Sequence, residues 1–157
     1  MVYPVQIRQG VPGDMDAEIA FAFRARAREV DWVFPEELRA NLERSPAIRS
    51  TVDRLAVGVF LAAEVDRVGD PLYGQVRRLA ELANADVAFI PVALRTGAEG
   101  VAGVSVVEIV STFLDVRTGR VIWFGVVAGR PGPVADFGSV ASAVERLAEK
   151  LFWYMRP

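Results

Sequence analysis

The sequence predicts a mixed α/β fold of the α+β kind: a single mixed β-sheet of about five strands, with a long hairpin, packed against about three helices. Helical segments alternate with apolar, β-rich runs, and an antiparallel hairpin comes late in the chain. The 157 residues fit one domain, and 52% apolar with 24% charged residues is typical of a globular protein. We therefore expect an irregular N-terminal arm over residues 1–17 and a single domain over residues 18–157.

Three segments carry helix signals. Pro35 occupies a first-turn position with two acids after it, and Ser45-Pro46 ends that helix. Asp70-Pro71 supplies an N-cap and a proline at the first helical position, and apolar residues follow at helical spacing. From Asp136 to about Tyr154, apolar residues recur every three or four positions, which is the strongest helical pattern in the chain.

Five runs are predicted as strands. In the first of them, apolar and arginine residues alternate with a period of two, which favours a strand, although alanine and arginine also form helices well. Pro91 cannot donate a ladder hydrogen bond, so its strand is expected at a sheet edge or interrupted there. Residues 96–100 are expected to turn. The five runs are residues 18–30, 54–65, 86–94, 101–116 and 120–128.

Arg117-Thr118-Gly119 is predicted to join the last two strands in a hairpin. The carboxylate of Asp115 is suited to accept backbone N–H groups of this turn, with Thr118 inside it. Gly119 supplies a left-handed backbone conformation. We expect Asp115, Thr118 and Gly119 to have this structural role, in preference to a ligand-binding role.

The composition excludes several kinds of chemistry. The chain has no cysteine and no histidine, so disulfides, thiolate nucleophiles, imidazole-based triads and zinc–histidine sites are excluded. Lys150 is the single lysine, and no glycine-rich loop precedes it, which excludes a phosphate-binding loop. We expect no metal and no cofactor. Glu64 and Glu108 lie in apolar strands and could serve acid–base catalysis, but exposed or arginine-paired positions are favoured.

Charge and hydropathy bear on partners and location. A formal net charge of −2 gives no bulk attraction to nucleic acid, which is not expected as a partner. The longest uncharged runs have nine residues, too few for a membrane-spanning helix. No signal peptide is recognisable at the N-terminus. The expected location is the periplasm or the outer membrane if a signal peptide was removed, and the cytoplasm otherwise.

Two groups of side chains are candidate binding residues. Arg24, Arg26 and Arg28 would share one face of a strand and form a basic stripe for an anion, although a solvated strand face is the favoured interpretation. Adjacent aromatic residues cannot all be buried on one face of one element, so some of them must contact another element or another molecule. The candidate interface residues are Trp32, Phe34, Phe152, Trp153 and Tyr154.

Two segments carry a family resemblance. Asn84-Ala85-Asp86 leads into an apolar strand, and the run from Phe113 through Asp115-Val116-Arg117-Thr118-Gly119 to Trp123 forms a hairpin pattern. Over residues 54–152 the chain resembles the envelope-lipoprotein group. This group includes the curli-secretion lipoprotein CsgG, the lipoprotein activators of penicillin-binding proteins and the N-terminal domain of TolB. The resemblance implies a mixed α/β domain of envelope proteins that act through protein contacts.

These observations favour a non-enzymatic cell-envelope protein that acts by protein–protein contact and self-assembles through its terminal aromatic residues and an exposed sheet edge. An envelope protein is the alternative partner to a second copy of the chain. The second hypothesis is a domain that binds a small molecule or an anion through the arginine stripe. An acid–base enzyme that uses Glu108 or Asp115 comes third, because it requires a pocket with at least two carboxylates.

Overall fold

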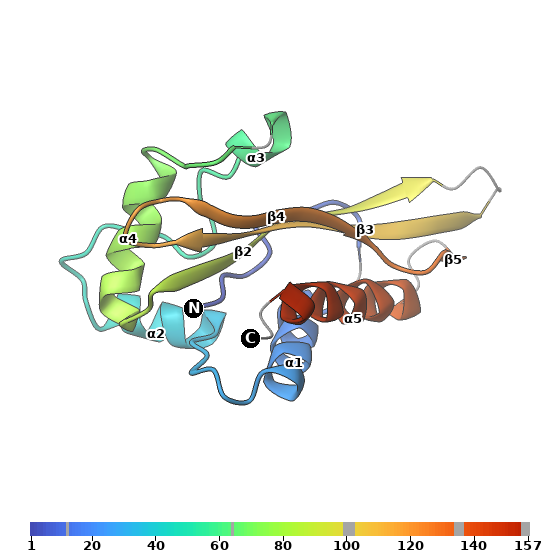
Figure 1. The fold of residues 1–157 in the computed structure, drawn as a ribbon, viewed down its shortest axis with the longest axis horizontal. Coiled ribbons are helices and arrows are strands. Elements are labelled where there is room, and N and C mark those ends of the chain that lie inside the picture. The colour runs from blue at the N-terminus through green and yellow to red at the C-terminus, as the bar shows by residue number, and fades with distance from the viewer. Residues whose placement is uncertain (12, 64, 99–102, 134–136, 155–157) are drawn as a thin grey trace. The chain divides into compact units, whose positions relative to one another are not determined.

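The computed structural model describes residues 1–11, 13–63, 65–98, 103–133 and 137–154 (Figure 1). One five-stranded mixed sheet has the strand order β1-β2-β3-β4, and β5 pairs with β3. This confirms the predicted fold class, with two helices more than expected. The elements of the described chain are β1 (Ile7–Arg8), α1 (Met15–Arg26), α2 (Pro35–Glu43), α3 (Val59–Ala62), α4 (Leu72–Ala83), β2 (Val87–Ala98), β3 (Val104–Asp115), β4 (Val121–Ala128), β5 (Gly132–Pro133) and α5 (Phe137–Tyr154).

The chain forms two compact units. Unit 1 comprises Met1–Gln6, Trp32–Val92 and Ser111–Gly125, and unit 2 comprises Ile7–Asp31, Ala93–Val110 and Val126–Pro157. The strands β2, β3 and β4 each begin in one unit and end in the other. The prediction of a single domain over residues 18–157 stays a prediction.

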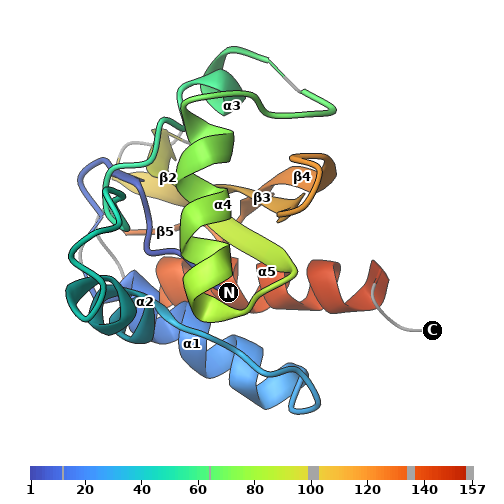
Figure 2. The same ribbon diagram turned by 90° about the vertical axis from the view of Figure 1, so that its left-hand side faces the viewer.

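In unit 1, helices α2 and α4 form where the sequence predicts them and pack against each other (Figure 2). The α4 helix begins after Pro71, and the Asp70 carboxylate accepts a hydrogen bond from Gly74 N at 2.9 Å. The apolar face of α4 is buried, with Leu79 fully inaccessible. In the sheet, the rings of Phe89 and Phe113 lie 4.9 Å apart, centroid to centroid.

The expected disruption at Pro91 does not occur, because β2 continues through it and lies between β1 and β3. Phe89 exchanges hydrogen bonds with the N-terminal segment: its N donates to Met1 O, and its O accepts from Tyr3 N, both at 2.9 Å. Pro91 lies two residues further along the strand and therefore faces the same side, where its carbonyl accepts from Gln6 N at 3.0 Å. The backbone N–H that Pro91 lacks would therefore point toward the N-terminal segment and not toward β3. The pairing of β2 with β3 does not need that N–H group.

The strand predicted over residues 54–65 is wrong. Residues 51–58 are irregular, and α3 follows. Two glutamine side chains satisfy the backbone donors that a strand ladder would have used: Gln6 Oε1 accepts from Leu55 N at 2.8 Å, and Gln75 Oε1 accepts from Ala56 N at 3.0 Å. Glu64 lies outside the described residues.

The strand predicted over residues 18–30 is also wrong, because helix α1 occupies most of this segment. Asp14 caps the helix by accepting from Ala17 N at 3.1 Å, and acids in the first turn and arginines in the last complement the helix dipole. The buried side chains follow helical spacing: Met15, Ile19, Ala20 and Phe23.

In unit 2, α5 confirms the helix predicted from residue 136, and it packs against α1 (Figure 1). Phe23 of α1 contacts Phe152 of α5 edge-to-face, with ring centroids 5.3 Å apart. Arg26 of α1 pairs with Glu145 and Glu149 of α5, at 3.4 Å each. Within the first 17 residues, β1 pairs in parallel with β2, Ile7 opposite Ala93.

Two neighbouring hydroxyl groups of β3 are predicted to respond oppositely to removal. Thr112 Oγ1 donates to Trp123 O at 2.9 Å, whereas the buried Ser111 Oγ has no protein hydrogen-bond partner. We expect Thr112→Val to destabilise the protein by ~1 kcal/mol, because it removes this hydrogen bond to a partly buried carbonyl group. Ser111→Ala is expected to be neutral or stabilising. Urea unfolding of both variants measures the difference, and equal losses of stability would contradict it.

Candidate functional site

The structure separates the predicted interface aromatics into partnered and exposed residues. Phe34 is buried, and the half-buried Trp32 packs against it at 6.2 Å between ring centroids. Phe152 is half-buried against Phe23. Trp153 is 73% exposed, and Tyr154 ends α5 with a side chain outside the described part of the structure. Among the aromatics predicted for an interface, Trp153 is therefore the one that the described structure leaves exposed.

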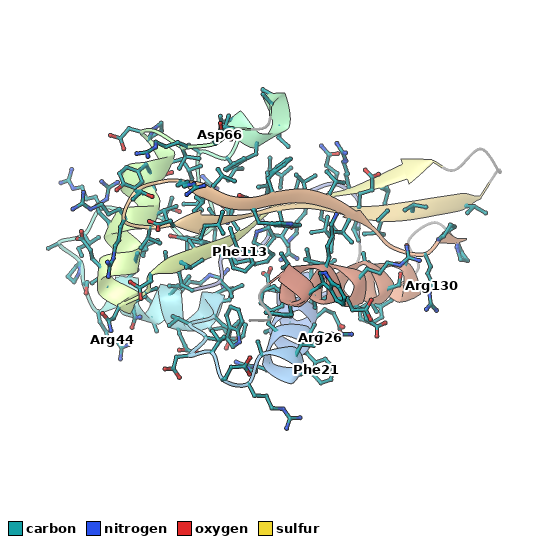
Figure 3. All side chains as sticks on the ribbon, viewed as in Figure 1. Phe21, Arg26, Arg44, Asp66, Phe113 and Arg130 are labelled. Carbon is teal, nitrogen blue, oxygen red and sulfur yellow. The ribbon has the colours of Figure 1, made fainter. Side chains whose placement is uncertain are left out.

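A second exposed aromatic residue lies on the helix that packs against α5. Phe21 of α1 is 73% exposed and projects outward from the helix (Figure 3). Sequence analysis did not find it, because a strand over residues 18–30 would have placed it on the same face as Ile19 and Phe23. On the helix, those two side chains are buried, while Phe21 lies about 160–200° away from them around the axis. Helix α1 thus exposes Phe21, and α5 exposes Trp153 and, less fully, Phe137, which is 49% exposed.

The three candidate anion-binding arginines do not form the expected stripe. Arg24 and Arg26 belong to α1, and Arg28 follows its end, so a period of two no longer places them on one face. Arg26 already contacts two carboxylates, Glu145 and Glu149. An anion would have to compete with these two acids.

The hairpin turn between β3 and β4 is held by Asp115, Thr118 and Gly119. Asp115 Oδ1 accepts hydrogen bonds from Arg117 N and Thr118 N at 2.9 Å and from Thr118 Oγ1 at 3.0 Å. These bonds, above all the one from Thr118 N, hold the pKa of the exposed Asp115 carboxyl below its usual value. Gly119 has a φ of 70°, and Tyr73 OH donates to Arg117 O. The three hydrogen bonds that this carboxylate oxygen accepts all come from residues of the turn itself.

The β4 strand and helix α3 carry a second exposed apolar surface, within unit 1. Ile122 of β4 is 54% exposed, and Leu61 and Val59 of α3 are 52% and 40% exposed. Phe60 of α3 stacks on Phe124 of β4 with ring centroids 5.8 Å apart and an interplanar angle of 14°. This stack fixes α3 against the strand. We call Val59, Leu61 and Ile122 the edge surface.

A polar cleft of about 330 Å³ lies between the C-terminal half of α4 and the β3–β4 turn. Its charged side chains are paired with one another: Arg77 with Glu81 at 3.1 Å and Arg117 with Asp86 at 3.3 Å. The second pair is 80% exposed on both sides. Because these charges are paired and solvated, the cleft offers little free charge for binding a charged ligand.

The remaining candidate catalytic carboxylate and the helices bear on catalysis and membrane insertion. Glu108 pairs with Arg95 at 2.8 Å, which agrees with the favoured interpretation of that residue. Across the described ranges, no group of three or more acidic side chains is placed to hold a metal ion. No helix in the described part of the chain is long and apolar enough to cross a membrane.

Comparisons with known proteins find matches to solved structures at low sequence identity. No family model matches the sequence, and no curated protein matches it either. The fold is similar to lipoprotein GNA1162 from Neisseria meningitidis, at 13% identity and a TM-score of 0.48, covering 98% of this chain and 96% of that one. It is also similar to the hypothetical protein CT253 from Chlamydia trachomatis, at 13% identity and a TM-score of 0.40, covering 98% and 90%.

Proposed function

We propose that this chain is a non-enzymatic cell-envelope domain that acts by protein–protein contact and self-associates. The observation that carries the proposal is the exposure of large apolar side chains in a chain that buries or half-buries most of its other described aromatic residues. Trp153 and Phe21 are each 73% exposed, and the edge surface adds three aliphatic residues. Exposed tryptophan and phenylalanine supply large contact areas at low entropic cost, and tryptophan is enriched among binding hot spots.

The envelope part of the proposal rests on the sequence resemblance. The hairpin from Phe113 to Trp123 carries the Asp-x-x-Thr-Gly pattern of the envelope-lipoprotein group. The contacts of Asp115 support its interpretation as a turn, because its carboxylate is occupied by Arg117 and Thr118. Because Asp115 stabilises this turn, its contacts favour a structural role for the residue over a catalytic one. This agrees with a domain that acts by contact with partners.

Replacing Trp153 by alanine is expected to weaken self-association. Loss of an exposed tryptophan from the centre of an interface raises the dissociation constant by about tenfold or more. Size-exclusion chromatography with light scattering, over a range of protein concentrations, measures this change. The matched control is Phe137→Ala, at the opposite end of the same helix, where the side chain is 49% exposed.

Far-ultraviolet circular dichroism should be the same for wild type and both variants, since each side chain is exposed. A discrete multiple of 17.1 kDa that persists on dilution supports self-association. A wild-type monomer at every concentration contradicts it. An oligomer that Trp153→Ala and Phe137→Ala affect equally contradicts the assignment of Trp153.

A further inference from the structure

The outer edge of β4 is covered by a backbone segment at its start, and at its end Arg146 Nη1 donates to Ala128 O at 3.0 Å. β4 is the last strand in the order β1-β2-β3-β4. Next to the hairpin turn, Val121 N donates to Asp66 O and Val68 N donates to Gly119 O, both at 2.8 Å, and Arg67 bridges to Arg120. In the parts of the chain that the structure describes, no other segment pairs with this edge from Ile122 onward. An edge of this kind presents N–H and C=O groups that a further strand can bind.

The side chains around this edge are apolar. Ile122, Leu61 and Val59 form the edge surface, and the stacked rings of Phe60 and Phe124 join α3 to the strand. The Trp123 ring lies against Gly125, where an added Cβ atom would come within 2.6 Å of it. A row of backbone donors and acceptors within ordered apolar side chains matches one kind of ligand, an extended strand with apolar side chains of its own.

Free edges of natural sheets are usually protected by charged residues, by proline or by very short length. The β4 sequence Val-Ile-Trp-Phe-Gly-Val-Val-Ala has no charged residue and no proline over eight residues. We propose that this edge pairs in an antiparallel manner with β4 of a second copy of the chain, so that the two sheets continue into each other. The inference rests on the proposed self-association and names the surface that carries it.

A second copy fits this edge for two reasons. A two-fold antiparallel pair brings β4 against itself, and an uncharged strand can do this without opposing like charges. The covered starts of the two edges, at Asp66–Val68, would then lie at opposite ends of the paired strands and would not collide. In a parallel pair, the two covered starts would meet side by side.

The test combines a charge variant with a backbone measurement. Ile122→Lys places like charges in the paired edge and is expected to raise the dissociation constant at least tenfold in light scattering, whereas Ile122→Val should leave it within twofold. Arg44→Lys is the control substitution: it lies on an exposed residue at the end of α2, away from β4, and should leave the dissociation constant unchanged. Hydrogen exchange should show that those amides of residues 122–127 that point away from β3 are protected at least tenfold more at high than at low protein concentration.

The outcomes separate this inference from the broader proposal. A wild-type monomer at all concentrations overturns both. An oligomer whose β4 amides exchange at the same rate at all concentrations, and whose affinity Ile122→Lys leaves unchanged, overturns the edge pairing alone and leaves self-association through Trp153. An oligomer that Ile122→Lys dissociates, with concentration-dependent protection of β4, establishes the pairing even if Trp153→Ala has no effect.

Discussion

Replacing Gly129 by alanine is expected to destabilise the fold by about 1–3 kcal/mol, or more. A Cβ atom at this position would lie 2.3 Å from Ser139 O, 2.9 Å from Ser142 Oγ and 3.1 Å from Ala143 Cβ. The nearest of these atoms belongs to the backbone of α5 and cannot rotate away. The loop after β4 would have to move off the helix, which would break the hydrogen bonds that hold it there. Urea denaturation followed by circular dichroism measures the loss.

The matched control is Gly58→Ala, at the start of α3. Gly58 has a φ of −54°, and no atom lies within 4 Å of the Cβ that alanine would add. This change should leave the free energy of unfolding within about 0.5 kcal/mol or raise it slightly, because it restricts the unfolded chain. Equal stability of the two variants would show that the close approach at Gly129 is not rigid.

Gly129 lies this close to α5 because a cluster of polar side chains in unit 2 bonds residues 128–130 to the helix. Ser139 Oγ donates to Arg130 O at 2.8 Å and accepts from Val107 N at 3.2 Å, which gives a β3 amide a side-chain partner. Ser142 Oγ accepts from Arg130 N at 2.7 Å, and Arg146 donates to the carbonyl oxygens of Ala128 and Gly129. Sequence analysis did not find this cluster, because two serines in an amphipathic helix give no local sign of distant backbone partners.

The elements that the sequence predicts correctly are those whose signals are local. Helices α2 and α5 follow from a proline start with acidic neighbours and from apolar spacing, respectively. The segments that were predicted wrongly depend on tertiary contacts or on competing local signals. Residues 54–65 are apolar enough for a strand, but Gln6 and Gln75 occupy the Leu55 and Ala56 amides. In α1, the Asp14 cap outweighs the alternation that favours a strand.

The candidate interface residues also divide into those that local sequence signals predict and those that depend on tertiary packing. Adjacent aromatic residues at Phe152 and Trp153 must diverge on any helix, so an exposed aromatic at the end of α5 could be predicted. The burial of Phe34, with Trp32 packed against it, depends on the packing of unit 1 and could not. The open edge of β4 required the strand order, which places β4 last and β2 inside the sheet despite Pro91.

Gly119→Ala is expected to cost roughly 2–4 kcal/mol, the larger of the two effects argued here, because two penalties combine. The φ of Gly119 is 70°, a left-handed conformation that alanine adopts at a cost. Alanine would also bring its Cβ to 2.9 Å from both the Tyr73 ring and the Val68 carbonyl oxygen. The second penalty is tertiary, and the Asp-x-x-Thr-Gly pattern does not reveal it.

Gly10→Ala separates the two penalties. Gly10 has a similar φ of 63°, but nothing lies within 4 Å of the added Cβ, so its replacement should cost roughly 1 kcal/mol from backbone strain alone. The difference between the two variants in the free energy of unfolding, measured by urea denaturation, then gives the cost of the close approach at Gly119. Similar losses of stability in the two variants would mean that Tyr73 and Val68 move aside at little energetic cost. A larger loss at Gly119 would show that the turn is held from outside the hairpin, by the same segment that covers the start of the β4 edge.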